Sequence, residues 1–124
     1  MRRTVRYGTG WHPIRIRLSW FRDVGIPQLQ TIAEQEKRPM PALCPRIKLK
    51  LTAAPLPEDQ RLMGEGTIDQ VHRDMEALQT LGCSHVLLDT YYDDAEATRH
   101  PETAWRMLTT MAEKVLDLCH ETLK

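Results

Sequence analysis

The sequence lacks a long apolar run and an excess of charge of either sign. No apolar stretch approaches the roughly 18 residues of a membrane-spanning helix, so we expect no membrane contact of that kind. Basic and acidic residues both number 17, and the zero formal charge argues against a broad nucleic-acid or anionic-lipid surface. The first residues are basic but are followed by Gly10, Trp11 and His12 rather than an apolar segment, so no signal peptide is expected.

Aromatic residues and cysteines are also few. A single phenylalanine among seven aromatic residues (Phe 1, Trp 3, Tyr 3) predicts a largely aliphatic core. Cys44, Cys83 and Cys119 are an odd number without disulfide-framework spacing, which favours reduced thiols in a cytoplasmic protein. The length suits one domain over residues 1–124, and the absence of net charge removes a barrier to self-association.

Motifs for metal binding and covalent catalysis are missing as well. The five histidines form no His-x3-His or Glu-x2-His pair on a helix face, so we predict no metal site. The sequence holds no Gly-x-Ser-x-Gly element, and we name no catalytic residue. Gly8-x-Gly10 and Gly64-x-Gly66 lack the third glycine of a dinucleotide fingerprint and are interpreted as turns.

The clearest pattern that is present is a helix followed by a strand. The spacing predicts a helix over Thr67–Leu81, because Thr67 and Gln70 fit a capping box and apolar residues then recur every three or four positions. Gly82 follows as the helix stop. The run HVLLD (85–89) does not alternate, which is typical of a parallel strand covered on both faces.

Four further elements complete the secondary-structure prediction. RIKLKLT (46–52) and IRIRL (14–18) alternate strictly, which indicates strands with one wet face. Between them, 19–37 is mostly helical, with a turn at Gly25 and Pro27 before the main helix. A last helix is predicted from Pro101 through Leu123. Its expected apolar face is Trp105, Leu108, Ala112, Val115 and Cys119.

The resulting order is strand, helix, strand, helix, strand, helix. Three βα units predict an α/β fold with a parallel sheet. Such a sheet has two open edges, which favours association with a second copy, as a homodimer or larger homo-oligomer.

The segment RRTVRYGTGWHPI (2–14) and the stretch from Arg61 to Asp89 are two separated motifs, and both resemble segments of the luciferase-like monooxygenases, a flavin- or deazaflavin-dependent family of TIM-barrel enzymes. RRTVRYGTGWHPI (2–14) is similar to the family's RRAARYGDGWHPI segment. The stretch from Arg61 to Asp89 is similar to its late helix and "hhhLD" strand, in the same order and at the same distance. One departure is Trp20 and Phe21, where the family usually has acidic residues; they either pack against a second copy or form a local hydrophobic staple.

The resemblance covers only the C-terminal part of a barrel. It implies a flavin- or deazaflavin-dependent oxidoreductase fragment, inactive alone, that uses FMN or a deazaflavin coenzyme if it binds any cofactor. The family's upstream "P-I-hh-G-G" segment, which helps hold the cofactor phosphate, has no counterpart here, so an N-terminal half is a possible missing partner. The alternative is a non-catalytic homo-oligomeric binding or scaffold module built from half-barrels.

Gly10, Trp11 and His12 are the cofactor-binding residues that the resemblance implies. In this interpretation Trp11 is a pocket wall and His12 a polar contact; in the other, Trp11 fills the core and His12 caps a turn. Asp89 and the following Thr90, Tyr91 and Tyr92 end the last strand. Asp89 either orients a ligand or serves as a cap or salt-bridge partner.

The basic residues of RIKLKL raise a separate question. Burying unpaired cations costs several kcal/mol each, so Arg46, Lys48 and Lys50 are expected to be either solvated or paired.

Overall fold

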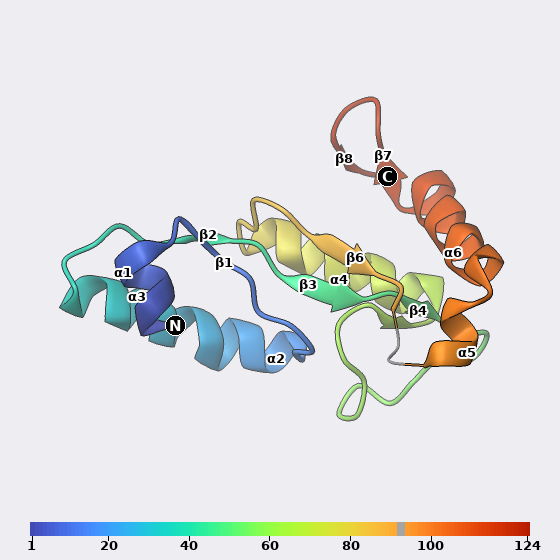
Figure 1. Cartoon of the computed structure of the whole chain (residues 1–124). Coiled ribbons are helices and arrows are strands. Elements are labelled where there is room, and N and C mark those ends of the chain that lie inside the picture. Colours follow the sequence, from blue (N-terminus) through green and yellow to red (C-terminus); the bar gives the residue numbers. More distant parts are fainter. Residues whose placement is uncertain (92–93) are drawn as a thin grey trace.

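The computed structural model describes residues 1–91 and 94–124, which form a mixed α/β fold (Figure 1). In chain order the elements are α1 (Arg2–Tyr7), β1 (Gly10–Trp11), α2 (Leu18–Trp20), the π-helical turn η1 (Phe21–Gly25), α3 (Ile26–Gln35), β2 (Ala42–Leu43), β3 (Arg46–Lys48), β4 (Lys50–Leu51), β5 (Glu65–Gly66), α4 (Ile68–Thr80), β6 (Leu87–Asp89), α5 (Ala95–Thr98), α6 (Pro101–Lys114), β7 (Leu116–Asp117) and β8 (Thr122–Leu123).

Three chain segments run side by side in parallel, in sequence order, and the short strand β5 pairs in parallel with β4 on the same side as β1. The central segment carries β2, β3 and β4. On one side it pairs with β1, and the N–H of Cys44 donates to the carbonyl of Trp11 at 2.9 Å. On the other side β3 pairs with β6, and the N–H of Leu87 donates to the carbonyl of Pro45 at 3.0 Å. The predicted parallel α/β arrangement is therefore confirmed, although its pairings are short and close no barrel among the described residues.

The two faces of this sheet differ. Ile47 and Leu49 lie on the helix-covered face and are only 1% and 0% exposed. Figure 1 shows α4 running behind β3 and β6, whereas no helix of the described residues lies in front of these strands. Arg46, Lys48 and Lys50 alternate onto this open face, as the sequence predicts. The register aligns Leu87 with Arg46, so the open face continues across β6.

The helix α4 forms as the sequence predicts. The hydroxyl oxygen of Thr67 accepts from the N–H of Gln70, and the Gln70 side chain accepts from the N–H of Thr67, which completes the capping box. Gly82 follows with a φ of 76°, the left-handed conformation that glycine adopts most readily. Val71 and Leu78 are fully buried and attach the helix to the core.

The helical segment before β2 is more continuous than predicted. Gly25 and Pro27 do not break it; instead the N–H of Ile26 donates to the carbonyl of Phe21, five residues earlier. This wide turn accommodates the proline, which cannot donate a helical hydrogen bond. A Cβ on Gly25 would lie 2.9 Å from ring atoms of both Trp11 and Trp20, so glycine allows these rings to approach the helix.

Two strand predictions need correction. The segment 14–18 is not a strand: only Ile14 forms an isolated bridge, to Arg46, and α2 begins at Leu18. The strand β6 has the predicted position, but it is not covered on both faces, since Leu87 is 48% exposed. The run of apolar residues 86–88 therefore spans one covered and one open face of the sheet.

The last helix is shorter than predicted. α6 ends at Lys114 rather than reaching Leu123, and the chain turns into the antiparallel pair β7–β8. Asp117 explains the change, because its carboxylate accepts hydrogen bonds from the backbone N–H and from Nδ1 of His120 and so favours a turn.

The buried face of α6 also differs from the prediction. The fully or nearly buried side chains are Met107, Met111 and Val115, spaced by four residues. Trp105, which was expected on this face, is 68% exposed, and Cys119 lies exposed in the β7–β8 turn. Leu108 and Ala112 are half-buried beside the apolar stripe.

Candidate functional site

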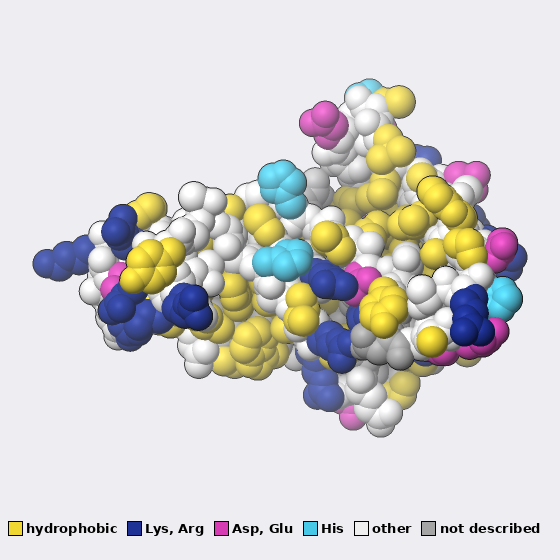
Figure 2. All heavy atoms as spheres, in the orientation of Figure 1, with side chains coloured by type: hydrophobic (Ala, Val, Ile, Leu, Met, Phe, Trp, Pro, Cys, Tyr) yellow, Lys and Arg dark blue, Asp and Glu magenta, His cyan; other side chains and the backbone are white. Residues whose placement is uncertain are grey.

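A hollow lies on the open face, where the parallel strands end. It measures about 310 Å³ and is lined by Ile14, Arg15, Arg46, Lys48, Asp89 and Tyr91. Ile14 and Arg15 follow β1, Lys48 and Asp89 end β3 and β6, Tyr91 lies beyond β6, and Arg46 opens β3. Most of the lining therefore lies at or beyond the carboxyl ends of paired strands, the edge at which α/β proteins place their ligand sites. Figure 2 views this face and shows basic, acidic and histidine side chains gathered among separate apolar ones.

A single carboxylate organises the hollow. Oδ2 of Asp89 lies 3.0 Å from Nε and 2.9 Å from Nη2 of Arg46, and 3.2 Å from Nζ of Lys48. Its other oxygen accepts from the N–H of Tyr91 at 2.9 Å. The Lys48 ammonium also donates to the Tyr91 carbonyl and lies 5.5 Å from the centre of its ring. Two cations therefore share one carboxylate.

The environment keeps Asp89 ionised. Burial alone would raise the pKa of its carboxyl, but the hydrogen bonds from Tyr91, Lys48 and Arg46 outweigh it and lower the pKa below its ordinary value. Asp89 is thus a salt-bridge partner at the end of the strand, one of the two interpretations that the sequence left open. Lys48 is paired and only 8% exposed, whereas Lys50 is exposed.

The residues implied by the family resemblance lie on both faces of β1. Gly10 is on the open face, where a Cβ would meet the thiol of Cys44 at 3.4 Å. His12 is exposed, and its Nδ1 lies 2.7 Å from the carbonyl oxygen of Cys44. A carbonyl only accepts, so Nδ1 carries the hydrogen and Nε2 is left for solvent or a ligand.

Trp11 points to the opposite, helix-covered face. It is 7% exposed, and its ring stacks on Phe21 with 5.6 Å between centroids and tilts against Trp20 at 6.3 Å. The position corresponds to the core-filling interpretation of Trp11. Phe21 is also fully buried, whereas Trp20 at the outer side of this cluster is 37% exposed.

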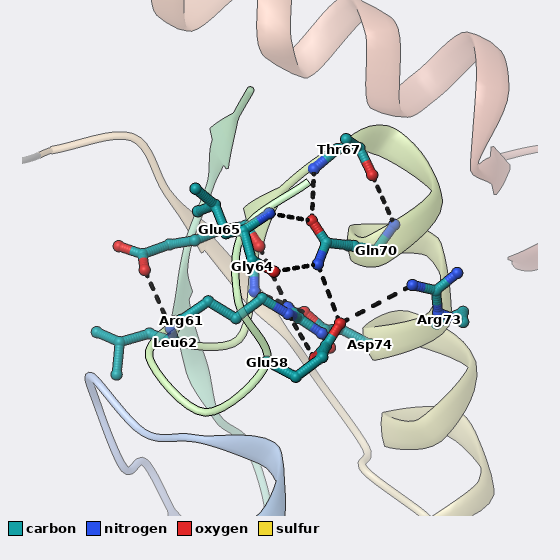
Figure 3. A network of polar contacts seen from close by, with 10 residues as sticks. Glu58, Arg61, Leu62, Gly64, Glu65, Thr67, Gln70, Arg73 and Asp74 are labelled. Carbon is teal, nitrogen blue, oxygen red and sulfur yellow. Dashed lines mark hydrogen bonds and ion pairs between the residues drawn. The ribbon is translucent and has the colours of Figure 1, made fainter. Parts of the chain in front are cut away.

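A second ion network joins the 54–66 loop to α4 (Figure 3). Arg61 and Asp74 form a bidentate pair at 2.7 and 2.8 Å, with side chains only 6% and 1% exposed. Oδ2 of Asp74 also accepts from the N–H of Gly64 at 2.9 Å. Hydrogen bonding to Asp74 raises the pKa of Arg61 despite its burial, so the guanidinium remains charged.

The rest of this network fixes the loop. Gln70 accepts from the N–H of Leu56 at 3.0 Å and donates to the carbonyl of Leu56 and to Glu58. A Cβ on Gly64, whose φ is 88°, would lie 2.2 Å from the carbonyl oxygen of Lys48. The loop therefore packs tightly beside the central segment, and the network is structural. Sequence patterns did not reveal it, because pairing between Arg61 and Asp74 has no fixed spacing.

One thiol and a second hollow are also described by their surroundings. Burial and the nearby Cys44 raise the pKa of Cys83 to about 11, so its thiol stays protonated rather than nucleophilic. A groove of about 370 Å³ separates α4 from the β7–β8 turn and is mainly apolar. Asp94 caps α5, while the predicted strand-end and loop residues 92–93 lie outside the described residues.

Comparisons with protein-family models, curated proteins and solved structures find no match for this chain. Within residues 1–91 and 94–124, no helix is long and apolar enough to cross a bilayer. The same residues contain no cluster of three or more histidine, cysteine or acidic side chains arranged to hold a metal ion.

Proposed function

We propose that the chain supplies three βα units of a barrel of the luciferase-like, flavin- or deazaflavin-dependent oxidoreductase type. Alone, it binds FMN or a deazaflavin coenzyme weakly and does not turn over. The proposed enzyme class rests on the two sequence segments that resemble this family. The parallel pairing of β1, the central segment and β6 in sequence order, with α4 behind β3 and β6, is consistent with consecutive units of such a barrel.

The hollow at the carboxyl ends of the strands is the observation that carries the proposal. Its volume of about 310 Å³ is near the lower limit of roughly 300 Å³ for small-molecule pockets, so it fits part of a flavin rather than the whole cofactor. Further strands, from a second copy or another segment, would cover the remainder. A bound flavin supplies the redox chemistry, and the chain's own residues orient it and exclude water.

Two groups on this face suit such a ligand. Nε2 of His12 is available as a hydrogen-bond acceptor when the ring is neutral, because Nδ1 donates to Cys44. Arg46 contributes positive charge from a side chain that is 38% exposed. Both are placed by backbone pairing between β1 and the central segment, so their positions do not depend on a mobile loop.

The test is a titration with FMN and, separately, with a deazaflavin coenzyme, followed by cofactor fluorescence. We expect saturable quenching, and His12→Ala should weaken binding by about 3–10-fold, the equivalent of one neutral hydrogen bond. His120→Ala, which removes an exposed histidine from the β7–β8 turn, is the matched control and should leave the affinity unchanged. Absence of binding to either cofactor would contradict the proposal.

A homo-oligomeric binding or scaffold module is the second candidate. It is favoured by the exposure of Ile14, Leu87 and Tyr91, which are 51%, 48% and 47% exposed on or beside the open face. Light scattering on a size-exclusion column distinguishes the candidates. A tight dimer that binds no cofactor, and that Leu87→Lys converts to a monomer, would favour the module over the oxidoreductase part.

A further inference from the structure

We infer that the hollow at the strand ends is an oxyanion site, in which Arg46 binds a phosphate or carboxylate group with its free guanidinium edge. The inference deepens the proposed function, on which it rests for the placement of the ligand. It specifies the chemical group that the hollow selects and the residue that binds it, which neither strand order nor the family resemblance provides for these residues.

The first argument is the geometry of Arg46. Its contacts within the described part of the chain use Nε and Nη2, both directed at Oδ2 of Asp89. Nη1 remains for a ligand, on a side chain that is 38% exposed and lines the hollow. A guanidinium presents its donors in a planar fork, and this geometry matches the oxygens of phosphate and carboxylate groups.

The second argument is that the site is already organised. Asp89 holds Arg46 by two contacts, and Lys48 shares the same carboxylate oxygen at 3.2 Å. The backbone N–H of Tyr91 fixes the other carboxylate oxygen. Asp89 therefore acts as a positioning residue, and Arg46 needs little rearrangement to receive an anion. Such organisation reduces the loss of side-chain conformational entropy on binding.

The third argument is the composition of the wall. Three of the six lining residues, Arg15, Arg46 and Lys48, are cationic, and Asp89 is the one carboxylate among these six. Arg15 has a φ of 51°, an uncommon conformation for a residue other than glycine or asparagine, and it follows the Ile14 bridge directly. Backbone outliers of this kind concentrate at ligand sites, and here the outlier is Arg15, a cationic residue that lines the hollow.

The test measures binding of inorganic phosphate and acetate to the whole chain by isothermal titration calorimetry. Arg46→Gln should weaken phosphate binding by about 10-fold or more, the effect of losing one charge-assisted hydrogen bond. Lys50→Gln removes the same formal charge from an exposed position two residues beyond Lys48 and should change the affinity less than about 2-fold. Circular dichroism verifies that both variants remain folded.

Three outcomes are decisive. A selective loss in Arg46→Gln supports the site. An equal loss in both variants would show general attraction to a basic surface and overturn it, as would the absence of phosphate and acetate binding by the unaltered chain. Should Arg46→Gln fail to fold, Arg46→Lys is the second variant: it keeps the charge without the fork and should lose most of the affinity, whereas full affinity would overturn the inference.

A parallel titration identifies the source of the oxyanion. FMN and riboflavin differ by the phosphate, so tighter binding of FMN that depends on Arg46 assigns the site to a cofactor phosphate. Phosphate binding without any flavin binding would indicate that the oxyanion belongs to a substrate. This outcome would support the oxyanion site and contradict only the proposed function. Equal binding of FMN and riboflavin with no competition from phosphate or acetate would overturn the inference and leave the proposed function standing.

Discussion

The chain contains two arginine–aspartate pairs that resemble each other in chemistry but differ in surroundings. Arg61 and Asp74 are 6% and 1% exposed, and the carboxylate is saturated by the guanidinium and the N–H of Gly64. Arg46 is 38% exposed and shares Asp89 with Lys48. The first pair closes a loop onto a helix, whereas the second leaves a donor edge beside a hollow.

The difference teaches how to separate structural charge from binding charge. A buried, bidentate pair holds its position because losing either partner leaves an uncompensated ion. A half-exposed arginine adds little stability, yet it can keep its donors available for a ligand. Substitutions in the two pairs should therefore have opposite consequences for folding and for binding.

The largest effect is expected for Asp74→Ala. It leaves the buried guanidinium of Arg61 and the N–H of Gly64 without their acceptor, and should lower the free energy of unfolding by about 3–5 kcal/mol. Urea denaturation followed by circular dichroism measures the change. Asp69→Ala, at an exposed position of the same helix, is the control and should lose less than about 1 kcal/mol. Similar losses in both variants would refute the structural role.

An intermediate effect, with a defined pH dependence, is expected for Asp89→Asn. The lowered pKa of Asp89 means that its contribution to stability is complete above the ordinary carboxyl value of 3.8 and is lost as the pH falls through the folded value. The free energy of unfolding of the unaltered chain should exceed that of the variant by about 1–3 kcal/mol at neutral pH.

That advantage should shrink when unfolding is measured below about pH 4. Asp59→Asn replaces an exposed loop carboxylate and controls for the loss of negative charge. The difference in free energy of unfolding between the unaltered chain and Asp89→Asn could instead stay constant from neutral to acid pH. That result would show that ionisation of Asp89 does not stabilise the fold.

The smallest effect on stability is expected for Arg46→Gln. Lys48 still neutralises Asp89, so the free energy of unfolding should fall by no more than about 1 kcal/mol. Thermal unfolding measures this change on the same sample that is used for oxyanion binding. A loss of stability as large as that of Asp74→Ala would make Arg46 a structural residue and remove the contrast between the two pairs.

Local signals in the sequence predicted part of the fold. The helix α4 follows from Thr67 and Gln70, whose interaction spans three residues. The placement of the basic residues of β3 on one face follows from strict alternation. The parallel pairing of β3 with β6 follows from the order of the elements. These features depend on neighbours in the sequence or on general rules of chain connection, so one sequence suffices to predict them.

The errors arose where distant contacts override local pattern. The exposure of Leu87 depends on whether anything covers the open face, and an apolar run does not contain that information. The end of α6 depends on the turn that Asp117 forms with His120. The candidate site was predicted only in part: Asp89 as a salt-bridge partner and Arg46 as paired or solvated, whereas their convergence with Arg15 required the fold.

The most direct test of the account maps where a ligand binds. Amide chemical shifts of the isotopically labelled chain would be followed by NMR during titration with FMN. The account predicts that the largest changes fall on 12–15, 46–48 and 89–91, with little change at Arg61 and Asp74. Changes centred on the groove between α4 and the β7–β8 turn would contradict it, because the carboxyl ends of the strands would then not be the binding site.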